Sequence, residues 1–348
     1  MFSIGEKMKR DSRYEIVRIV AAIFITINHI PVSANATQMN SIIQSFFFCG
    51  GQFGVSLFVI LGSWFLIDQR FKVERIVRIC VQTVFYSLFL DIFCLLLGYK
   101  FTLHSFFRSF SYWYPFGYIF LLLVAPFLSS IRSSYINKII ILGGGYGFVV
   151  TVLAYIDDSI IAVRLSQKGL IIGPLWFSYI YCLMRMIKEK NILEKIDCSL
   201  SLLGWGMTYL IMFVISLVFQ NAHIRDLVSP LCLISALFMF NFIRHLNVKQ
   251  NAKINFIAST TYGIYLFQVH LCFSSYIWLG LFNLKVLSEV SCLYGIVGIL
   301  AAAFIIICAI MIDSMRQLMN ITLRKVKNII VGNNTCYVEI CREREKVQ

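Results

Sequence analysis

Charged residues are scarce in this chain. Asp, Glu, Lys and Arg together make up 14% of its 348 residues, whereas about a quarter is usual in a soluble domain. Hydrophobic residues make up 59%, and the mean hydropathy is +0.79. A soluble fold of this length could not cover so much apolar surface, so lipid must solvate much of it. The composition excludes an ordinary soluble protein and predicts an all-α, polytopic bundle of membrane helices.

Acidic residues are especially few, which leaves a net charge of +14. In a soluble protein this excess would favour nucleic-acid binding. Here the basic residues lie in short segments between apolar stretches, a pattern that sets membrane topology instead. We therefore expect membrane lipid, and no nucleic acid, as a partner.

Several chemical motifs are missing. The chain has no C-x-x-C pair, no H-E-x-x-H, no G-x-S-x-G and no phosphate-binding P-loop. Most of its eleven cysteines lie inside apolar stretches, which is typical of buried free thiols. The sequence therefore predicts no metal site.

Long apolar stretches are abundant. Ten of them approach the roughly 20 residues that a helix needs to cross a bilayer, at 14–32, 42–67, 79–97, 112–128, 139–156, 170–187, 200–219, 227–243, 256–278 and 290–312. The ninth is the most polar, because it contains Ser259, Thr260, Thr261 and Gln268. The pattern predicts about ten transmembrane helices.

The distribution of Lys and Arg predicts the orientation. With the N-terminus inside, all but six of the 31 fall on the cytoplasmic side, the exceptions being Lys100, Arg108, Arg164, Lys168, Arg225 and Lys285. Both termini are thus expected in the cytoplasm, with a membrane domain over 1–312 and a basic tail over 313–348. Part of the tail, 315–331, has the composition of an amphipathic helix on the anionic inner surface. The basic start followed by Ala34-Asn35-Ala36 also fits a cleaved signal peptide, but Arg18 and His29 favour a first helix that is kept.

The first stretch carries two ionisable side chains on one face. Arg18 and His29 are eleven residues apart, which on a helix is three turns and a remainder of about 20°, with a rise of roughly 16 Å. Glu15 lies one turn before Arg18. Ionisable groups in a membrane helix usually face a cavity or a partner, so this face should point into the bundle. The alternative is that Arg18 extends to the membrane boundary and His29 lies at the interface.

Two further features stand out. Arg75 and Arg78 lie three residues apart just inside the membrane, and paired guanidinium groups match phosphate oxygens. Simple positive-inside charge is the alternative. Asp91 and His270 are ionisable residues within predicted spans. Glycines 50, 51, 54 and 62 permit close helix packing or a passage beside the second helix.

These segments together resemble a known family. Arg18 with His29, the stretch Gly54 to Leu66, Arg75-Ile76-Val77-Arg78, Tyr112-Trp113-Tyr114 through Leu128, and Thr261 to Leu266 follow one another in the order of the acyltransferase-3 family. These bacterial integral membrane enzymes O-acetylate cell-surface polysaccharides. The chain departs from the pattern at Gly62-Ser63, which reverses the family's pair, and at Gln268, which stands where the late histidine is expected.

The resemblance implies an O-acyltransferase in the bacterial cytoplasmic membrane. It would move an acyl group from a cytoplasmic acyl-CoA to a hydroxyl of a capsular or surface polysaccharide, or of its lipid-linked precursor. Acetyl is the usual group in this family, so acetyl-CoA is the expected donor. His29 would be the catalytic residue. Arg18, Arg75 and Arg78 would bind the donor, with Glu15, Trp113 and Tyr265 in support. His270 is rotated by about 200° from position 268, so it is not expected to replace the late histidine.

Other functions remain open from the sequence. A transporter or flippase of a lipid-linked glycan would require broken helices and charged residues near the midplane, for which Asp91 and His270 are candidates. A glycan polymerase usually has a large outer loop, and the predicted outer loops here are short.

Overall fold

The computed structural model describes residues 11–98, 112–156, 171–218 and 223–345, and every regular element among them is helical. The main helices are α1 (Ser12–Asn28), α2 (Gln38–Leu66), α3 (Val73–Leu96), α5 (Trp113–Ser130), α6 (Ser133–Ile156), α8 (Ile172–Glu189), α9 (Cys198–Val218), α10 (Pro230–His245), α11 (Ala252–Ser259), α12 (Thr261–Val269), α13 (Leu271–Ser275), α14 (Leu284–Val290) and α15 (Tyr294–Glu345). A π-helical turn, η3, covers Tyr276–Leu281, and short 3-10 turns lie at Leu193–Lys195 (η1) and His223–Arg225 (η2). Helices therefore overlap all ten predicted apolar stretches within the described residues.

Six helices within the described residues are long and apolar enough to cross a membrane, namely α2, α3, α5, α6, α9 and the first part of α15. A seventh crossing results if the segments Ala252–Val269 and Phe273–Val290 count as one span. Their outward faces carry many large apolar side chains, such as Leu142, Leu203 and Leu300, as lipid contact requires. The chain thus has the architecture of a multi-pass membrane protein.

The ninth stretch is not one continuous helix, so the prediction of an unbroken helix over 256–278 was wrong. It is divided among α11, α12, α13 and η3, and the two flanking segments are bent by 83° relative to each other. Polar residues sit at both junctions: Thr260 ends α11 and His270 ends α12. Such breaks place backbone groups where neighbouring helices or a cavity must satisfy them.

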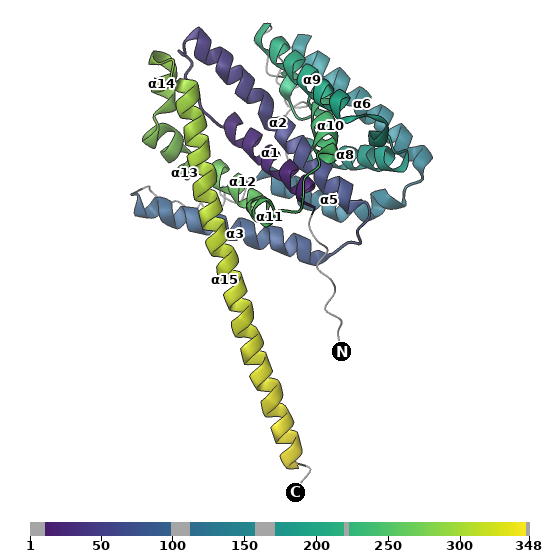
Figure 1. The fold of residues 1–348 in the computed structure, drawn as a ribbon, viewed down its shortest axis with the longest axis vertical. Helices are drawn as coiled ribbons and strands as arrows, with labels where there is room; N and C mark the ends of the chain where they lie inside the picture. Colours follow the sequence, from purple (N-terminus) through teal and green to yellow (C-terminus); the bar gives the residue numbers. More distant parts are fainter. Residues whose placement is uncertain (1–10, 99–111, 157–170, 219–222, 346–348) are drawn as a thin grey trace.

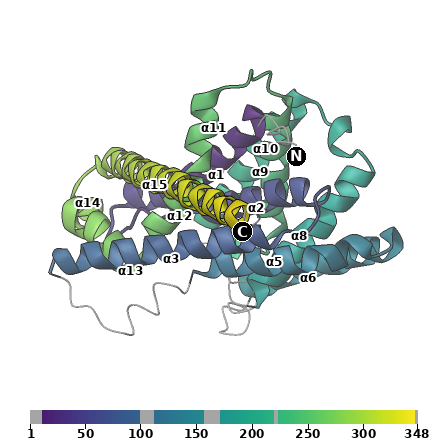
Figure 2. The same cartoon turned by 90° about the horizontal axis from the view of Figure 1, so that it is seen from below.

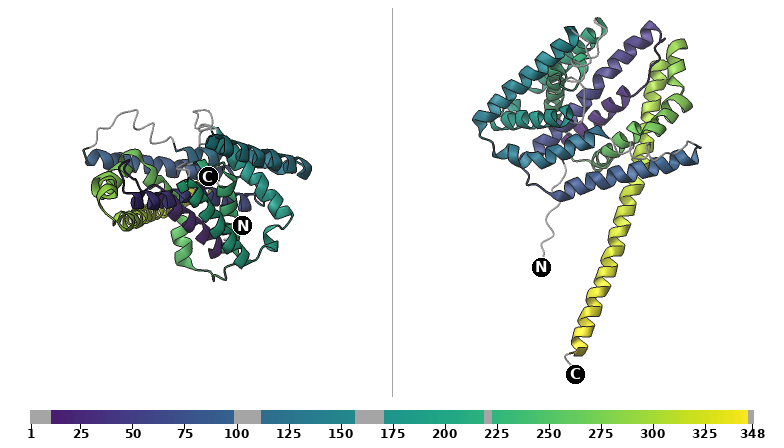
Figure 3. Two further views of the ribbon diagram at one scale, coloured as in Figure 1. Left: turned by 90° about the horizontal axis from the view of Figure 1, so that it is seen from above. Right: turned by 180° about the vertical axis from the view of Figure 1, so that it is seen from behind.

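Helix α1 is the central element of the bundle. It packs along α2 and also contacts α10, α11, α12 and α15 (Figure 1). The helix begins where Asp11 accepts a hydrogen bond from the backbone N–H of Arg13 at 3.0 Å, a typical N-cap. Seen from below in Figure 2, α3, α5 and α6 lie along one edge of the bundle. Figures 1 and 3 show α3 running crosswise to α15.

Helix α15 passes through the predicted boundary between residues 312 and 313 without a break. Figure 1 shows its second half leaving the bundle and projecting away from it. The start of the tail is therefore a continuation of the last membrane helix, rather than a separate helix on the inner surface.

Glycines bring α1 and α2 close together, as the packing interpretation predicts. A Cβ atom built at Gly50 would lie 2.7 Å from a ring carbon of Phe24, and one at Gly54 would lie 2.7 Å from the carbonyl oxygen of Ala21. Gly143 and Gly147 on α6 likewise face Tyr179 and Trp176 of α8. Small residues therefore set the spacing of these helix pairs.

Replacing Gly54 with alanine should destabilise the protein, because the new methyl group would meet the backbone of α1. Overpacking of this kind typically costs about 1–3 kcal/mol, visible as a lower thermal unfolding temperature in detergent. Gly145→Ala is the matched control, since outside its own stretch of helix no atom lies within 4 Å of a Cβ there. Equal melting temperatures for the two variants would contradict this account of the α1–α2 contact.

Candidate functional site

Two adjoining cavities lie where α1, α2, α3, α5, α11 and α12 meet. The first, of about 280 Å³, is lined by Tyr114, Tyr118, Tyr262 and Tyr265, and we call it the tyrosine chamber. The second, of about 510 Å³, contains Arg75 and opens toward the start of α1; we call it the arginine chamber. The two share a wall formed by Arg18, Gly62, Arg78, Ile79 and Tyr118. The two cavities therefore adjoin, and we call them together the hollow, with a cationic outer part and an aromatic inner part.

Arg18 faces this hollow and is held by Glu15. The Arg18 Nη1 atom lies 2.9 Å and 3.1 Å from the two carboxylate oxygens of Glu15. The Glu15 side chain is 6% exposed, whereas the Arg18 side chain is 35% exposed. A buried carboxylate thus fixes the guanidinium from one side and leaves its other side toward the cavity. This matches the prediction that the ionisable face of α1 points inward.

Arg75 and Arg78 reach the hollow from α3. Both line the arginine chamber, and Arg78 also lines the tyrosine chamber. Arg75 donates a hydrogen bond to the amide oxygen of Gln69. Within the described residues neither arginine has a carboxylate at ion-pair distance. The charge of this pair is therefore available to an anionic ligand, and three arginines predicted from two separate segments converge on one cavity.

Asp11 lies at the mouth of the arginine chamber and is already paired. Its carboxylate receives hydrogen bonds from Arg13, the shortest being 2.6 Å from Nη2. The hydrogen bond from Arg13 holds the pKa of Asp11 below its ordinary value. The carboxylate is therefore ionised at neutral pH and neutralises Arg13, not the arginines of the chamber.

The lowered pKa predicts a pH-dependent contribution to stability. It is present above the unfolded-state pKa of about 3.9 and is lost as the pH falls through the lower folded-state value. The stability difference between the native protein and Asp11→Asn, which keeps a capping side chain, should therefore shrink in strong acid. Melting temperatures in detergent at neutral and acidic pH measure this, and a difference that grew with acidity would contradict it.

The tyrosine chamber has a stacked aromatic wall. Tyr114 and Tyr118 are stacked with ring centroids 6.0 Å apart, and Tyr265 lies 5.3 Å from Tyr114. Tyr262 continues the row. Trp113 does not line the chamber; it packs against Tyr114 and Phe177 behind it. Its predicted supporting role is therefore packing, while Tyr265 contributes to the cavity surface itself.

Gly62 gives the reversed Gly-Ser pair a structural reason. A Cβ atom at Gly62 would lie 2.7 Å from the Tyr118 hydroxyl oxygen. Both residues belong to the wall shared by the two chambers. The absence of a side chain at this position lets the phenol ring occupy the junction.

His29 lies at the end of α1, beyond the chambers. It is the C-cap residue of α1, and its Nδ1 atom lies 2.6 Å from the carbonyl oxygen of Ile25. A carbonyl only accepts hydrogen bonds, so Nδ1 carries a proton, and when the ring is neutral Nε2 carries the lone pair. Ile25 lines the tyrosine chamber, but His29 lines neither cavity. The structure thus gives His29 the tautomer of a base and places it about one helical turn beyond the chamber lining.

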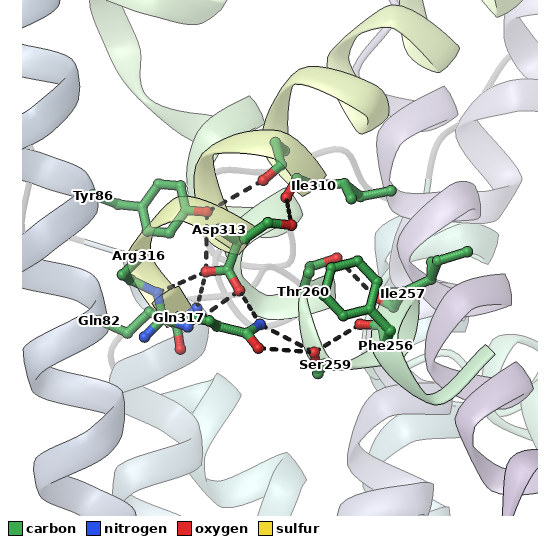
Figure 4. A network of polar contacts seen from close by, with 12 residues as sticks. Gln82, Tyr86, Phe256, Ile257, Ser259, Thr260, Ile310, Asp313, Arg316 and Gln317 are labelled. Carbon is green, nitrogen blue, oxygen red and sulfur yellow. Dashed lines mark hydrogen bonds and ion pairs between the residues drawn. The ribbon is translucent and has the colours of Figure 1, made fainter. Parts of the chain in front are cut away.

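A polar network beside the chambers was missed from the sequence. Its centre is Asp313 on α15, which is fully buried and was expected to be the first residue of the tail. Figure 4 shows its partners, which come from α3 and α15 and link onward to Ser259 of α11. Gln82 and Ser259 of this network also line the tyrosine chamber. The spacing of Arg75, Arg78 and Gln82 along one face of α3 could have indicated Gln82.

Asp91 and His270 form a second buried pair. The Nε2 atom of His270 lies 3.2 Å from a carboxylate oxygen of Asp91, and both side chains are nearly inaccessible. The two atoms are close enough for an ion pair, but their geometry is not that of a hydrogen bond. The sequence indicated both residues without indicating that they pair. Gln268 is also buried, with no hydrogen bond to its amide group within the described residues.

Comparisons with protein-family models, with curated proteins and with solved structures gave no match for this chain. The function of the chain must therefore be inferred from the arrangement of its own residues.

Proposed function

We propose that the chain is a membrane O-acyltransferase that takes an acyl group, acetyl in the first instance, from a cytoplasmic acyl-CoA. The acceptor is a hydroxyl of a cell-surface or capsular polysaccharide or of its precursor. The observation that supports this most is the convergence of Arg18, Arg75 and Arg78 on one hollow whose inner part is aromatic. An acyl-CoA has matching parts, namely a polyanionic nucleotide and a long, largely uncharged arm that ends in the thioester.

The donor fits the hollow in one direction. Its phosphates would bind in the arginine chamber, where guanidinium groups match phosphate oxygens in pairs. Its pantetheine arm would then follow Arg78 and Ile79 of α3 past the Tyr118 ring into the tyrosine chamber. Because Arg78 and Ile79 line both chambers, α3 provides a continuous surface along this path.

His29 would act on the acceptor. Nε2 would take the proton of the acceptor hydroxyl while the hydroxyl oxygen attacks the thioester carbonyl. CoA would leave as a thiolate, which is then protonated. The hydrogen bond from Nδ1 to Ile25 holds the ring in the tautomer that this step needs. A transient acyl-histidine, formed by attack of Nε2 on the thioester, is the alternative route.

The topology that accompanies this function has ten crossings with both termini in the cytoplasm, in a bacterial inner membrane. Within the described residues six helices, or seven segments with the bent pair, are long and apolar enough to cross a membrane, and shorter helices overlap the remaining predicted stretches. The Lys and Arg distribution supports the orientation. Under this topology Arg75 and Arg78 lie at the cytoplasmic side, where acyl-CoA is found, and His29 lies nearer the outer side.

The experiment that tests the proposal follows label from acetyl-CoA into glycan. Membranes containing the native protein, and membranes lacking it, are given acetyl-CoA labelled in the acetyl group. The proposal expects label in a surface glycan, or in its lipid-linked precursor, only when the protein is present. Equal labelling of the two membranes would contradict acyl transfer.

A second function, transport of a lipid-linked glycan, is favoured by two observations. The ninth stretch is bent by 83°, and the Asp91–His270 pair is buried in the bundle, as in transporters with broken helices. This function predicts glycan translocation without any acyl-CoA, and its loss in Asp91→Asn. Translocation that requires the protein but no acyl donor would replace the acyltransferase proposal.

A further inference from the structure

The buried carboxylate of Asp313 orients several side chains around it. Its Oδ1 accepts hydrogen bonds from Gln82 Nε2 at 3.0 Å, Tyr86 Oη at 3.2 Å and Arg316 Nε at 2.8 Å. Its Oδ2 accepts from Arg316 Nη2 at 3.1 Å and Gln317 Nε2 at 2.8 Å. The carboxylate is thus saturated by donors from two helices, α3 and α15 (Figure 4). Such a fully satisfied network is rigid.

The network reaches α11 and α12 as well. Gln317 Nε2 donates to the hydroxyl of Ser259 at 3.0 Å. A Cβ atom at Gly263 would lie 2.9 Å from Asp313 Oδ1 and would also collide with the Tyr86 hydroxyl. Helix α12 can therefore approach Asp313 only because residue 263 has no side chain. Through Asp313 the network therefore brings together α3, α11 and α12, which all enclose the tyrosine chamber.

Gln82 is the member of the network that both contacts Asp313 and lines the tyrosine chamber. Because Oδ1 of Asp313 accepts this hydrogen bond, the amide NH₂ group of Gln82 faces Asp313. Its carbonyl oxygen, Oε1, is thereby fixed on the other side of the amide. Within the described residues Oε1 has no hydrogen-bond partner. The residue is 6% exposed, and Oε1 is not one of the fully buried atoms that lack a partner, so it is accessible from the chamber that Gln82 lines. An acceptor held in a fixed orientation on the chamber wall can accept a hydrogen bond from a ligand in the chamber without first losing a partner.

The position of Gln82 identifies the part of the donor that it would contact. It lies four residues after Arg78 on the same face of α3, about 6 Å further along the helix axis. A donor whose phosphates are bound at the arginines would present the next part of its structure at Gln82. In an acyl-CoA that part is the pantetheine arm, which carries two amide N–H groups and no charge.

We propose that Gln82 is a donor-binding residue whose Oε1 accepts a hydrogen bond from an amide N–H of the pantetheine arm, and that Asp313 is the positioning residue that fixes this orientation. The inference rests on the proposed function, because it takes acyl-CoA as the donor. It adds a recognition element for the uncharged arm to the arginines that bind the phosphates.

Equilibrium binding to the full-length protein in detergent tests this with two probes. One is CoA, and the other is 3′-phosphoadenosine 5′-diphosphate, which has the same phosphates but no pantetheine arm. Gln82→Met keeps the size of the side chain and removes Oε1. It should weaken CoA binding about three- to tenfold, the effect of one neutral hydrogen bond, and leave binding of the armless nucleotide unchanged.

A matched control separates this contact from the integrity of the network. Gln317→Met makes the same chemical change at another amide bound to Asp313, and Gln317 does not line the tyrosine chamber. It should leave CoA binding within about twofold of the native value, well below the loss of one hydrogen bond. An equal loss of CoA affinity in the two variants would overturn the direct contact.

Asp313→Asn tests the positioning role. It should weaken CoA binding in the native background and cause no further loss in the Gln82→Met background, since coupled residues are not additive. Independent, additive losses would overturn the role of Asp313. If the native protein binds neither probe, the proposed function itself fails. If it binds CoA but Gln82→Met binds CoA equally well, only the present inference fails.

Discussion

Replacing His29 with alanine is expected to lower acetyl transfer by about 10²- to 10⁴-fold, the usual contribution of a positioned general base. The reason is local geometry: Nδ1 is bound to the carbonyl oxygen of Ile25 at 2.6 Å, so Nε2 is the nitrogen able to accept the acceptor's proton. Because His29 lines neither chamber, CoA binding should be unchanged. Labelled acetyl transfer and CoA affinity, measured on the same preparation, separate the two effects.

His245→Ala is the control for this substitution. His245 is an exposed histidine at the end of α10, with its Nε2 atom 3.0 Å from the carbonyl oxygen of Ile196. Its replacement should leave transfer at the native rate. Normal transfer by the His29 variant, at equal amounts of protein in the membrane, would contradict the role assigned to this residue.

Replacing Arg78 with alanine is expected to weaken CoA binding by about 10- to 100-fold. Hydrogen bonds to charged groups contribute roughly 1.5–3 kcal/mol, and about 1.4 kcal/mol corresponds to a tenfold change in affinity. Arg78 has no carboxylate partner within the described part of the chain, so its removal should affect the ligand more than the fold. Arg78→Lys should bind with intermediate affinity, because a lysine keeps the charge but cannot pair with a phosphate through two N–H groups.

Arg70 is the appropriate comparison for Arg78. It lies in the same basic segment before α3 and is exposed, but it lines neither chamber. If simple positive-inside charge were the reason for Arg78, the two alanine variants would bind CoA alike. We expect Arg70→Ala to bind CoA with near-native affinity.

The sequence predicted those parts of the site that depend on local periodicity. The shared face of Glu15 and Arg18 follows from helical spacing, and the structure joins them by hydrogen bonds. Arg75 and Arg78 likewise follow from their spacing of three. The helical nature of all ten apolar stretches was predictable for the same reason, since apolar length and composition are properties of a single segment.

Contacts between distant segments were not predictable. Gln82 and Asp313 are separated by 231 positions, so nothing local distinguished Asp313 from the first residue of a basic tail. The pairing of Asp91 with His270 was not predictable either, because these two residues are also far apart in the sequence. The break in the ninth stretch had a signal, the polar run at Ser259, Thr260 and Thr261, but the 83° bend depends on how α12 packs. The position of His29 beyond the chamber lining also required the three-dimensional structure.

Sided vesicles give the most direct test of the central claim. The purified protein is reconstituted with its cytoplasmic face outward and with a glycan acceptor trapped inside. Labelled acetyl-CoA is added outside, so that the donor meets only the cytoplasmic face of the protein. The account predicts that trapped glycan becomes labelled, that CoA thiol appears outside in equal amount, and that both stop with His29→Ala. Glycan that crosses the membrane without acetyl-CoA, and never acquires label, would contradict the account.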